Sequence, residues 1–173
     1  MNKIALIATV AIATSFVQAA QIAWDIEGVK YPKTSNLVPA SDTSVVAYLF
    51  NAATYSEDAI VTAIKDGKAS TLTNVGNVAK ADDVGYLAAS GKNESSLEYS
   101  TTYSFYAVVF DNATIDNASN YIITSASKRM KGSGTTSVSF DVSNSTWQAV
   151  PEPTSVALLA LGLAAVGLKR KVA

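Results

Sequence analysis

Alternation of apolar and polar residues is the dominant pattern in the middle of the chain, and it predicts β-strands. Residues 99–110 show it most clearly. One face carries Tyr103, Phe105 and Val109, while the opposite face changes from serine and threonine to apolar residues along the segment. This change predicts a strand that runs from a half-exposed edge into the interior, and therefore a central position in its sheet.

Four other segments have strand patterns. Residues 21–26 alternate around Trp24, and residues 44–51 are apolar on both faces, which is typical of a strand inside the stack. Residues 120–127 and 136–143 predict a hairpin across the loop KRMKGSGT. The second strand of this hairpin turns three apolar residues inward: Val138, Phe140 and Val142.

One segment, residues 56–67, has a helical pattern instead. Ser56 is suited to the N-cap, two acidic residues follow in the first turn, and Gly67 can end the helix. Its apolar side chains share one face: Ile60, Val61 and Ile64. Residues 70–93 are harder to assign and hold one or two weak strands, while residues 144–150 read as a short connection. The prediction is a mainly β fold, a small β-sandwich with one short helix, over residues 20–150.

Composition narrows the chemistry of this domain. The chain has no cysteine and no histidine, which excludes disulfides, zinc sites built on these residues and nucleophiles activated by imidazole. Residues 20–150 carry 13 Asp and Glu against nine Lys and Arg. An acidic domain is a poor candidate for binding nucleic acid, so we expect no nucleic-acid partner. We also expect no cofactor.

The N-terminus has the pattern of a secretory signal. A cation at Lys3 precedes an apolar run, which would form the signal helix, and small residues follow. Val17 and Ala19 fit the small-residue positions of a signal-peptidase site, which favours a signal peptide of residues 1–19. Cleavage after Ala20 is the alternative.

The C-terminus, residues 151–173, has three parts. A Pro-Glu-Pro triplet comes first, and residues 156–168 are uninterruptedly apolar, about 20 Å long as a helix. Lys169, Arg170 and Lys171 follow, and such cations stay on the cytoplasmic side of a membrane. We therefore expect a C-terminal membrane helix that leaves the upstream domain outside.

Pro151, Glu152 and Pro153, followed by this apolar run and basic cluster, resemble the PEP-CTERM sorting signal of proteins handled by exosortases. The resemblance implies a bacterium with an outer membrane, an inner-membrane-anchored precursor, and processing near the triplet before delivery to the cell surface or extracellular matrix. It also implies signal peptidase and an exosortase as partners. Proteins with this signal are often associated with exopolysaccharide and biofilm formation.

Few residues of the domain suggest chemistry of their own. Asp111 and Asp116 lie in an Asp- and Asn-rich stretch whose oxygens could bind calcium, although the spacing matches no EF-hand loop and these residues are also common in turns. Trp147, outside the predicted strands, is the best candidate for stacking on a sugar. Glycoside hydrolysis would need two carboxylates that face each other in a cleft. Such a pairing is a property of the fold and is not visible in the sequence.

The sequence therefore predicts a non-enzymatic, exported surface or matrix protein, without a bound metal, whose processing residues are Ala19, Ala20 and the triplet at 151–153. A carbohydrate-binding module that retains exopolysaccharide is the main alternative. A small glycoside hydrolase that uses carboxylates is the weaker one.

Overall fold

The computed structural model describes residues 19–78 and 81–151. Four predicted features lie outside the described residues: the signal helix at 1–18, the triplet residues Glu152 and Pro153, the apolar run at 156–168 and the basic cluster at 169–171. Within the described part of the chain, no helix is long and apolar enough to cross a membrane. The prediction of a mainly β fold with one α-helix is confirmed.

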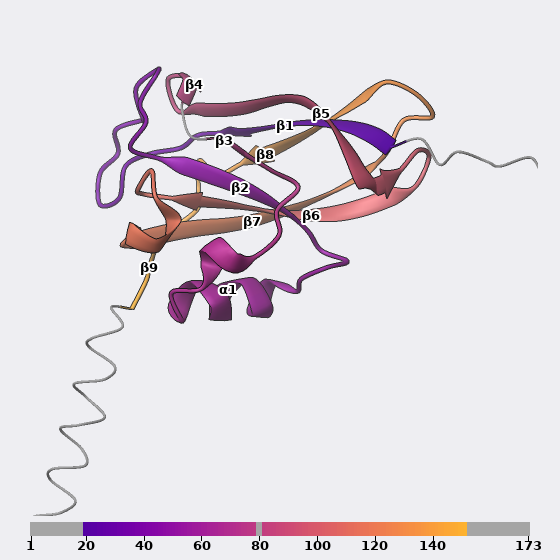
Figure 1. The fold of residues 1–173 in the computed structure, drawn as a ribbon. Coiled ribbons are helices and arrows are strands. Elements are labelled where there is room, and N and C mark those ends of the chain that lie inside the picture. The colour runs from indigo at the N-terminus through magenta and orange to yellow at the C-terminus, as the bar shows by residue number, and fades with distance from the viewer. Residues whose placement is uncertain (1–18, 79–80, 152–173) are drawn as a thin grey trace, which may run out of the picture.

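Within residues 19–78 and 81–151, nine strands form two sheets that face each other (Figure 1). The four-stranded sheet has the order β4-β5-β1-β8 and contains β4 (Ala81–Asp83), β5 (Tyr86–Glu98), β1 (Ala19–Glu27) and β8 (Thr135–Asp141). The five-stranded sheet has the order β3-β2-β6-β7-β9 and contains β3 (Gly76–Val78), β2 (Val46–Asn51), β6 (Thr102–Phe110), β7 (Asn120–Arg129) and β9 (Gln148–Ala149).

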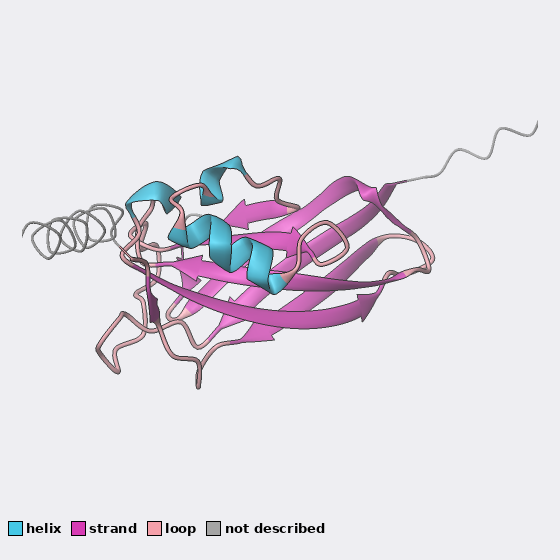
Figure 2. Ribbon diagram, turned by 90° about the horizontal axis from the view of Figure 1, so that it is seen from below, coloured by secondary structure: helices cyan, strands magenta, loops and turns pink. Residues whose placement is uncertain are grey.

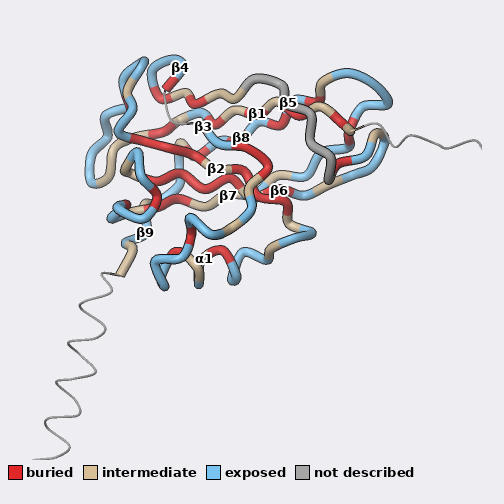
Figure 3. Tube along the Cα trace, in the orientation of Figure 1, coloured by how far each residue is buried: buried red, intermediate tan, exposed pale blue. Residues whose placement is uncertain are grey.

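The main core lies between the two sheets, where side chains of β1, β2, β5, β6 and β8 are buried (Figure 3). Ile22, Trp24 and Ile26 of β1 meet Phe105 and Val109 of β6 there, and all are at most 3% exposed. Burial of such side chains is the main source of stability in a domain that has no disulfide.

A second apolar layer covers the outer face of the five-stranded sheet. The helix α1 (Glu57–Lys65) lies over this sheet with two short 3-10 helices, η1 (Ala69–Thr71) and η2 (Ile115–Asn117) (Figure 2). Ser56 caps α1 by accepting a hydrogen bond from the backbone N–H of Ala59, and Ile60 and Ile64 are buried. The helix predicted from residues 56–67 is therefore confirmed, including its N-cap.

The strand predicted over residues 99–110 forms β6 and is the central strand of its sheet, as expected. Phe105 and Val109 face the core between the sheets, whereas Val108 and Phe110 face the helix layer. The early residues are exposed on the face that turns apolar later, which matches the predicted passage from a half-exposed end into the interior.

The predicted hairpin between residues 120–127 and 136–143 is wrong. These segments form β7 and β8, which belong to different sheets: β7 pairs with β6 and β9, while β8 runs parallel to β1. The loop between them crosses from one sheet to the other. The inward direction of Val138, Phe140 and Val142 is nevertheless correct, because facing the core does not depend on the pairing partner.

The segment that the sequence left unassigned holds more structure than expected. It contains β3, β4 and the first part of β5, a 13-residue strand that pairs with β1 along most of its length. Two register shifts interrupt this pairing, and such irregularities blur the strict alternation by which a strand is recognised.

Candidate functional site

The chain leaves the described domain at Pro151, and the residues that lead there are fixed to the domain. After β8, Asp141 Oδ1 accepts the backbone N–H of Ser143 at 2.8 Å. The side chain and backbone of Ser143 lower the pKa of the Asp141 carboxyl, and the charge of Lys30 lowers it further. This turn begins the segment that leads to Pro151.

The loop after β1 holds the turn in place. Gly28 has φ +77°, and a Cβ built there would lie 2.1 Å from Ser143 Oγ and 2.7 Å from its Cα. Only glycine allows this approach at this backbone angle. Lys30 Nζ donates a hydrogen bond to the carbonyl of Ser143 at 2.9 Å, and the Lys30 carbonyl accepts the indole N–H of Trp147 at 2.9 Å.

The next residues form β9, which lies along the start of β7. Asn120 pairs with Ala149, and Tyr121 pairs with Gln148. The Tyr121 hydroxyl donates a hydrogen bond to Gln148 Oε1 at 2.8 Å, and the Val150 N–H donates to the Ser119 carbonyl at 2.8 Å. The Val150 side chain packs against the apolar layer under α1. We call Gln148, Ala149 and Val150 the C-terminal clamp.

Residues 144–150, predicted as a short connection, contain the two-residue strand β9 and contact the domain. Residues 144–146 are exposed, Trp147 and Val150 are half-buried, and the exposed residues Gln148 and Ala149 pair with β7. Each hydrogen bond contributes about 0.5–1.5 kcal/mol net. Together with the packing of Val150 and Trp147, the contacts hold the chain in place up to Pro151.

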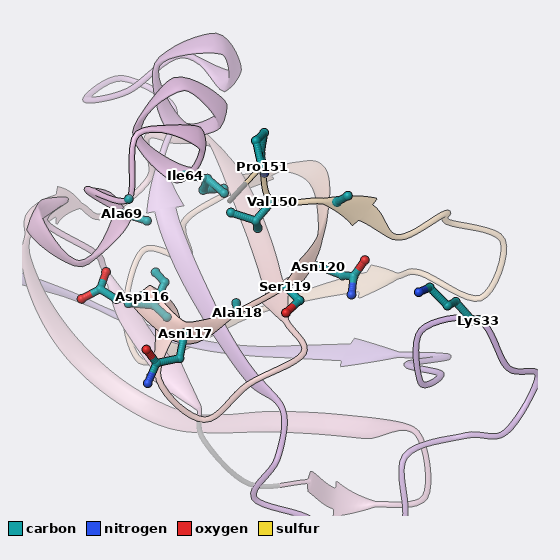
Figure 4. A pocket seen from close by; sticks show the side chains of 13 residues that line it. Lys33, Ile64, Ala69, Asp116, Asn117, Ala118, Ser119, Asn120, Val150 and Pro151 are labelled. Atoms are coloured by element: carbon teal, nitrogen blue, oxygen red, sulfur yellow. The ribbon is translucent and has the colours of Figure 1, made fainter. Parts of the chain in front are cut away.

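A pocket of about 390 Å³ opens beside the clamp (Figure 4). Its wall contains Val150 and Pro151 next to Ile64 of α1, and its other side is the η2 loop. Polar side chains from that loop and from the loop after β1 line the remainder: Asp116, Asn117, Ser119, Asn120 and Lys33. The pocket thus combines apolar wall with amide, hydroxyl and charged groups.

Comparison with known families identifies the segment that begins in this clamp. Residues 149–171 match the PEP-CTERM protein-sorting motif. The match confirms the resemblance seen in the sequence and implies an exported protein that an exosortase sorts to the cell surface. No curated protein matches the sequence.

The PEP-CTERM motif overlaps the folded domain. Its first two residues, Ala149 and Val150, belong to the C-terminal clamp, and its Pro151 is half-buried at the pocket. The junction between domain and motif therefore contains no free spacer. Sequence reasoning missed the residues that build this junction on the domain side: Gly28, Lys30, Ser119 and Tyr121.

The other candidate residues from the sequence lie as follows. Trp147 is half-buried, packs against the main core and uses its indole N–H for Lys30, so it is not a free flat platform. Asp111 organises the η2 loop: Oδ1 accepts the N–H groups of Ser119 and Asn120, and Oδ2 accepts the Asn120 amide. Asp116 is exposed at the pocket.

These placements bear on metal binding. The described residues contain no group of three or more Asp, Glu, His or Cys that could hold a metal ion. The carboxylate of Asp111 is occupied by backbone and amide hydrogen bonds, which is the common role of aspartate in a turn. Asp111 and Asp116 thus have a structural and an exposed position, respectively.

The two residues predicted as signal-cleavage sites lie at the start of β1. Ala19 is half-buried and pairs with Glu98, whereas Ala20 is fully buried in the main core. Cleavage after Ala19 would leave the core intact. Cleavage after Ala20 would remove one of its side chains.

Alkaline pH is expected to weaken the clamp through Tyr121. Burial, and then the charge of Glu57, raise the pKa of the Tyr121 hydroxyl. The folded state therefore keeps this phenol neutral at a pH where the unfolded chain, with a pKa of about 10, already ionises. Its contribution to stability is complete below about pH 10 and is lost as pH rises through the folded pKa.

Urea unfolding at several pH values between 8 and 11 measures this loss. Tyr86, whose pKa is raised chiefly by its hydrogen bond to Asp25, adds to the same decline. Tyr121→Phe should therefore reduce the decline without abolishing it. An unchanged dependence on pH in this variant would show that Tyr121 does not titrate with folding.

Proposed function

We propose that this chain is a non-enzymatic surface or extracellular-matrix protein, displayed outside a bacterium with an outer membrane after sorting by an exosortase. The observation that carries the proposal is the PEP-CTERM motif at residues 149–171, joined directly to a folded β domain. The folded domain is the part that is delivered, and the motif directs its delivery.

The proposed route has three steps. Signal peptidase cuts the precursor, and the burial of Ala20 favours the bond after Ala19. The apolar run at 156–168 then anchors the precursor in the inner membrane, with Lys169, Arg170 and Lys171 on the cytoplasmic side. The exosortase finally processes the chain near the triplet and releases the domain for delivery.

Two observations support a non-enzymatic domain. Histidine and cysteine are missing from the sequence, so the usual acid-base group near neutral pH and the usual thiol nucleophile are not available. Among the described lining residues of the pocket, Asp116 is the one carboxylate, whereas glycoside hydrolysis requires a pair.

Retention of exopolysaccharide is the second candidate function. The pocket is a better candidate than Trp147 for the sugar contact, because Asn117, Asn120 and Lys33 offer hydrogen-bond donors beside an apolar wall. A pull-down with matrix polysaccharide compares the wild type with Asn117→Ala and with Thr146→Ala, an exposed control. Loss of retention in Asn117→Ala alone supports the pocket.

Replacing Pro151, Glu152 and Pro153 together by alanine tests the sorting proposal. We expect the variant to accumulate as full-length precursor in the inner membrane, because the exosortase no longer recognises it. Fractionation of the source bacterium and immunoblotting measure the shift. Thr146→Ala, just outside the motif, should be delivered normally. Unchanged delivery of the triple variant would contradict the proposal.

A further inference from the structure

We propose that the C-terminal clamp keeps the peptide bonds before Pro151 away from the sorting enzyme, so that the chain is cut on the C-terminal side of Pro151 and the released protein retains β9. The proposal rests on the sorting function above and adds where the cut can fall. It follows from how Gln148, Ala149 and Val150 are held.

The backbone of the clamp is paired with β7, which limits access to it. Enzymes that act on peptides commonly bind them as extended segments through main-chain hydrogen bonds and side-chain pockets. In the clamp, the backbone groups that face β7 already have partners, because β9 pairs with β7 and the Val150 N–H bonds to the Ser119 carbonyl at 2.8 Å. The enzyme would have to break these contacts before it could bind the same residues.

Side-chain contacts also hold the clamp on the domain. Val150 packs against the apolar layer that contains Ile60, Ile64 and Tyr121, and Tyr121 is fully buried. Pulling Val150 away would expose this layer to water, which is unfavourable. The Tyr121 hydroxyl would also lose Gln148 Oε1, its partner at 2.8 Å.

The pocket would also lose part of its lining. Val150 and Pro151 lie in its wall (Figure 4), and Ala149 lines it as well. A cut before Pro151 would remove Pro151 from the mature protein, and a cut further upstream would also remove Val150 or Ala149. A cut after Pro151 keeps the pocket complete. The PEP-CTERM motif begins at Ala149, inside the clamp. Its first residues therefore stay with the domain after such a cut.

The chemistry of the cut is ordinary acyl transfer. The amide C–N bond breaks, and the acyl carbon passes to water or to an enzyme nucleophile, which loses its proton. The departing tail takes up a proton as an amine. The clamp takes no part in these steps and limits only which bond can reach the enzyme.

Digestion of the full chain, purified in detergent from a host without a sorting enzyme, tests the clamp by itself. Treatment with a non-specific protease and intact-mass analysis should give a resistant fragment that ends at or beyond Pro151. The variant Val150→Ala with Tyr121→Phe should yield fragments ending before Gln148 about tenfold faster, because cleavage follows local opening. Val84→Ala, an exposed valine, is the matched control and should behave as wild type.

Val150→Ala alone should show the same shift to a smaller extent, which keeps the test valid if the double variant does not fold. A wild-type resistant fragment that ends before Gln148 would overturn the clamp. Equal digestion of Val150→Ala and Val84→Ala would overturn it as well.

Processing in the source bacterium gives the second readout. The released protein should have a C-terminus at or beyond Pro151, and one that ends at Val150 or earlier would overturn the proposal. If the chain has the same mass and location with and without the sorting enzyme, the proposed sorting function is wrong. The digestion experiment still decides whether the clamp exists.

Discussion

Phe105→Ala is expected to lower the free energy of unfolding by about 3–5 kcal/mol. Phe105 is fully buried at the centre of β6, between the two sheets, where its ring lies 6.3 Å from that of Tyr103. Alanine would remove most of the side chain and leave a cavity that the surrounding strands cannot fill, because both sheets are fixed by their pairing.

Thermal and urea unfolding measure the effect, and we expect a fall in melting temperature of about 10 °C. Val84→Ala is the control, since Val84 is 55% exposed and should change stability by about 0.5 kcal/mol or less. A loss below about 1 kcal/mol for Phe105→Ala would mean that the two sheets do not share this core.

Gly28→Ala should have the second large effect. A Cβ at this position would meet Ser143 Oγ at 2.1 Å and the Ser143 backbone nitrogen at 2.7 Å, so the turn after β8 would have to move. Its positive φ of +77° adds about 1–2 kcal/mol for a residue with a side chain. Steric overlap with backbone adds about 1–3 kcal/mol more.

Gly67→Ala separates these two contributions. Gly67 also has a positive φ, +66°, but nothing lies within 4 Å of a Cβ there. Urea unfolding of both variants should therefore show a larger loss for Gly28→Ala. Because Ser143 leads to Trp147 and β9, Gly28→Ala should also speed protease attack on the clamp. Equal losses for the two variants would contradict the close approach of Gly28 and Ser143.

Local signals made much of the fold predictable. The helix could be placed because its cap, its acidic first turn, its apolar face and its terminal glycine all lie within twelve residues of one another, at 56–67. The alternation in β6 gave both its faces and its central position. Such patterns report which side of an element is buried.

Strand partners could not be predicted in the same way. The core-facing residues of β8 are the same whether β8 pairs with β7 or with β1, so the alternation of β8 contains no signal against a hairpin. Parallel pairing of β8 with β1 joins the two ends of the domain. Register shifts in β5 interrupt the regular alternation by which a strand is recognised in a sequence.

The sorting motif and the C-terminal clamp differ in the same way: the first is contiguous in the sequence, and the second depends on distant residues. The sorting motif could be predicted because its triplet, apolar run and basic cluster are contiguous in the sequence. The clamp could not, because its supports join distant residues: Lys30 contacts Ser143 and Trp147, which are 113 and 117 positions away. Only the folded structure shows that the motif begins inside the domain.

The most direct test is the intact mass and location of the native protein in the source bacterium, with and without its exosortase. With the enzyme present, the account predicts a surface or extracellular protein that starts at Ala20 and ends at or beyond Pro151. Without the enzyme, it predicts a membrane-bound form that retains residues up to Ala173. A full-length chain dissolved in the cytosol in both strains would contradict the account.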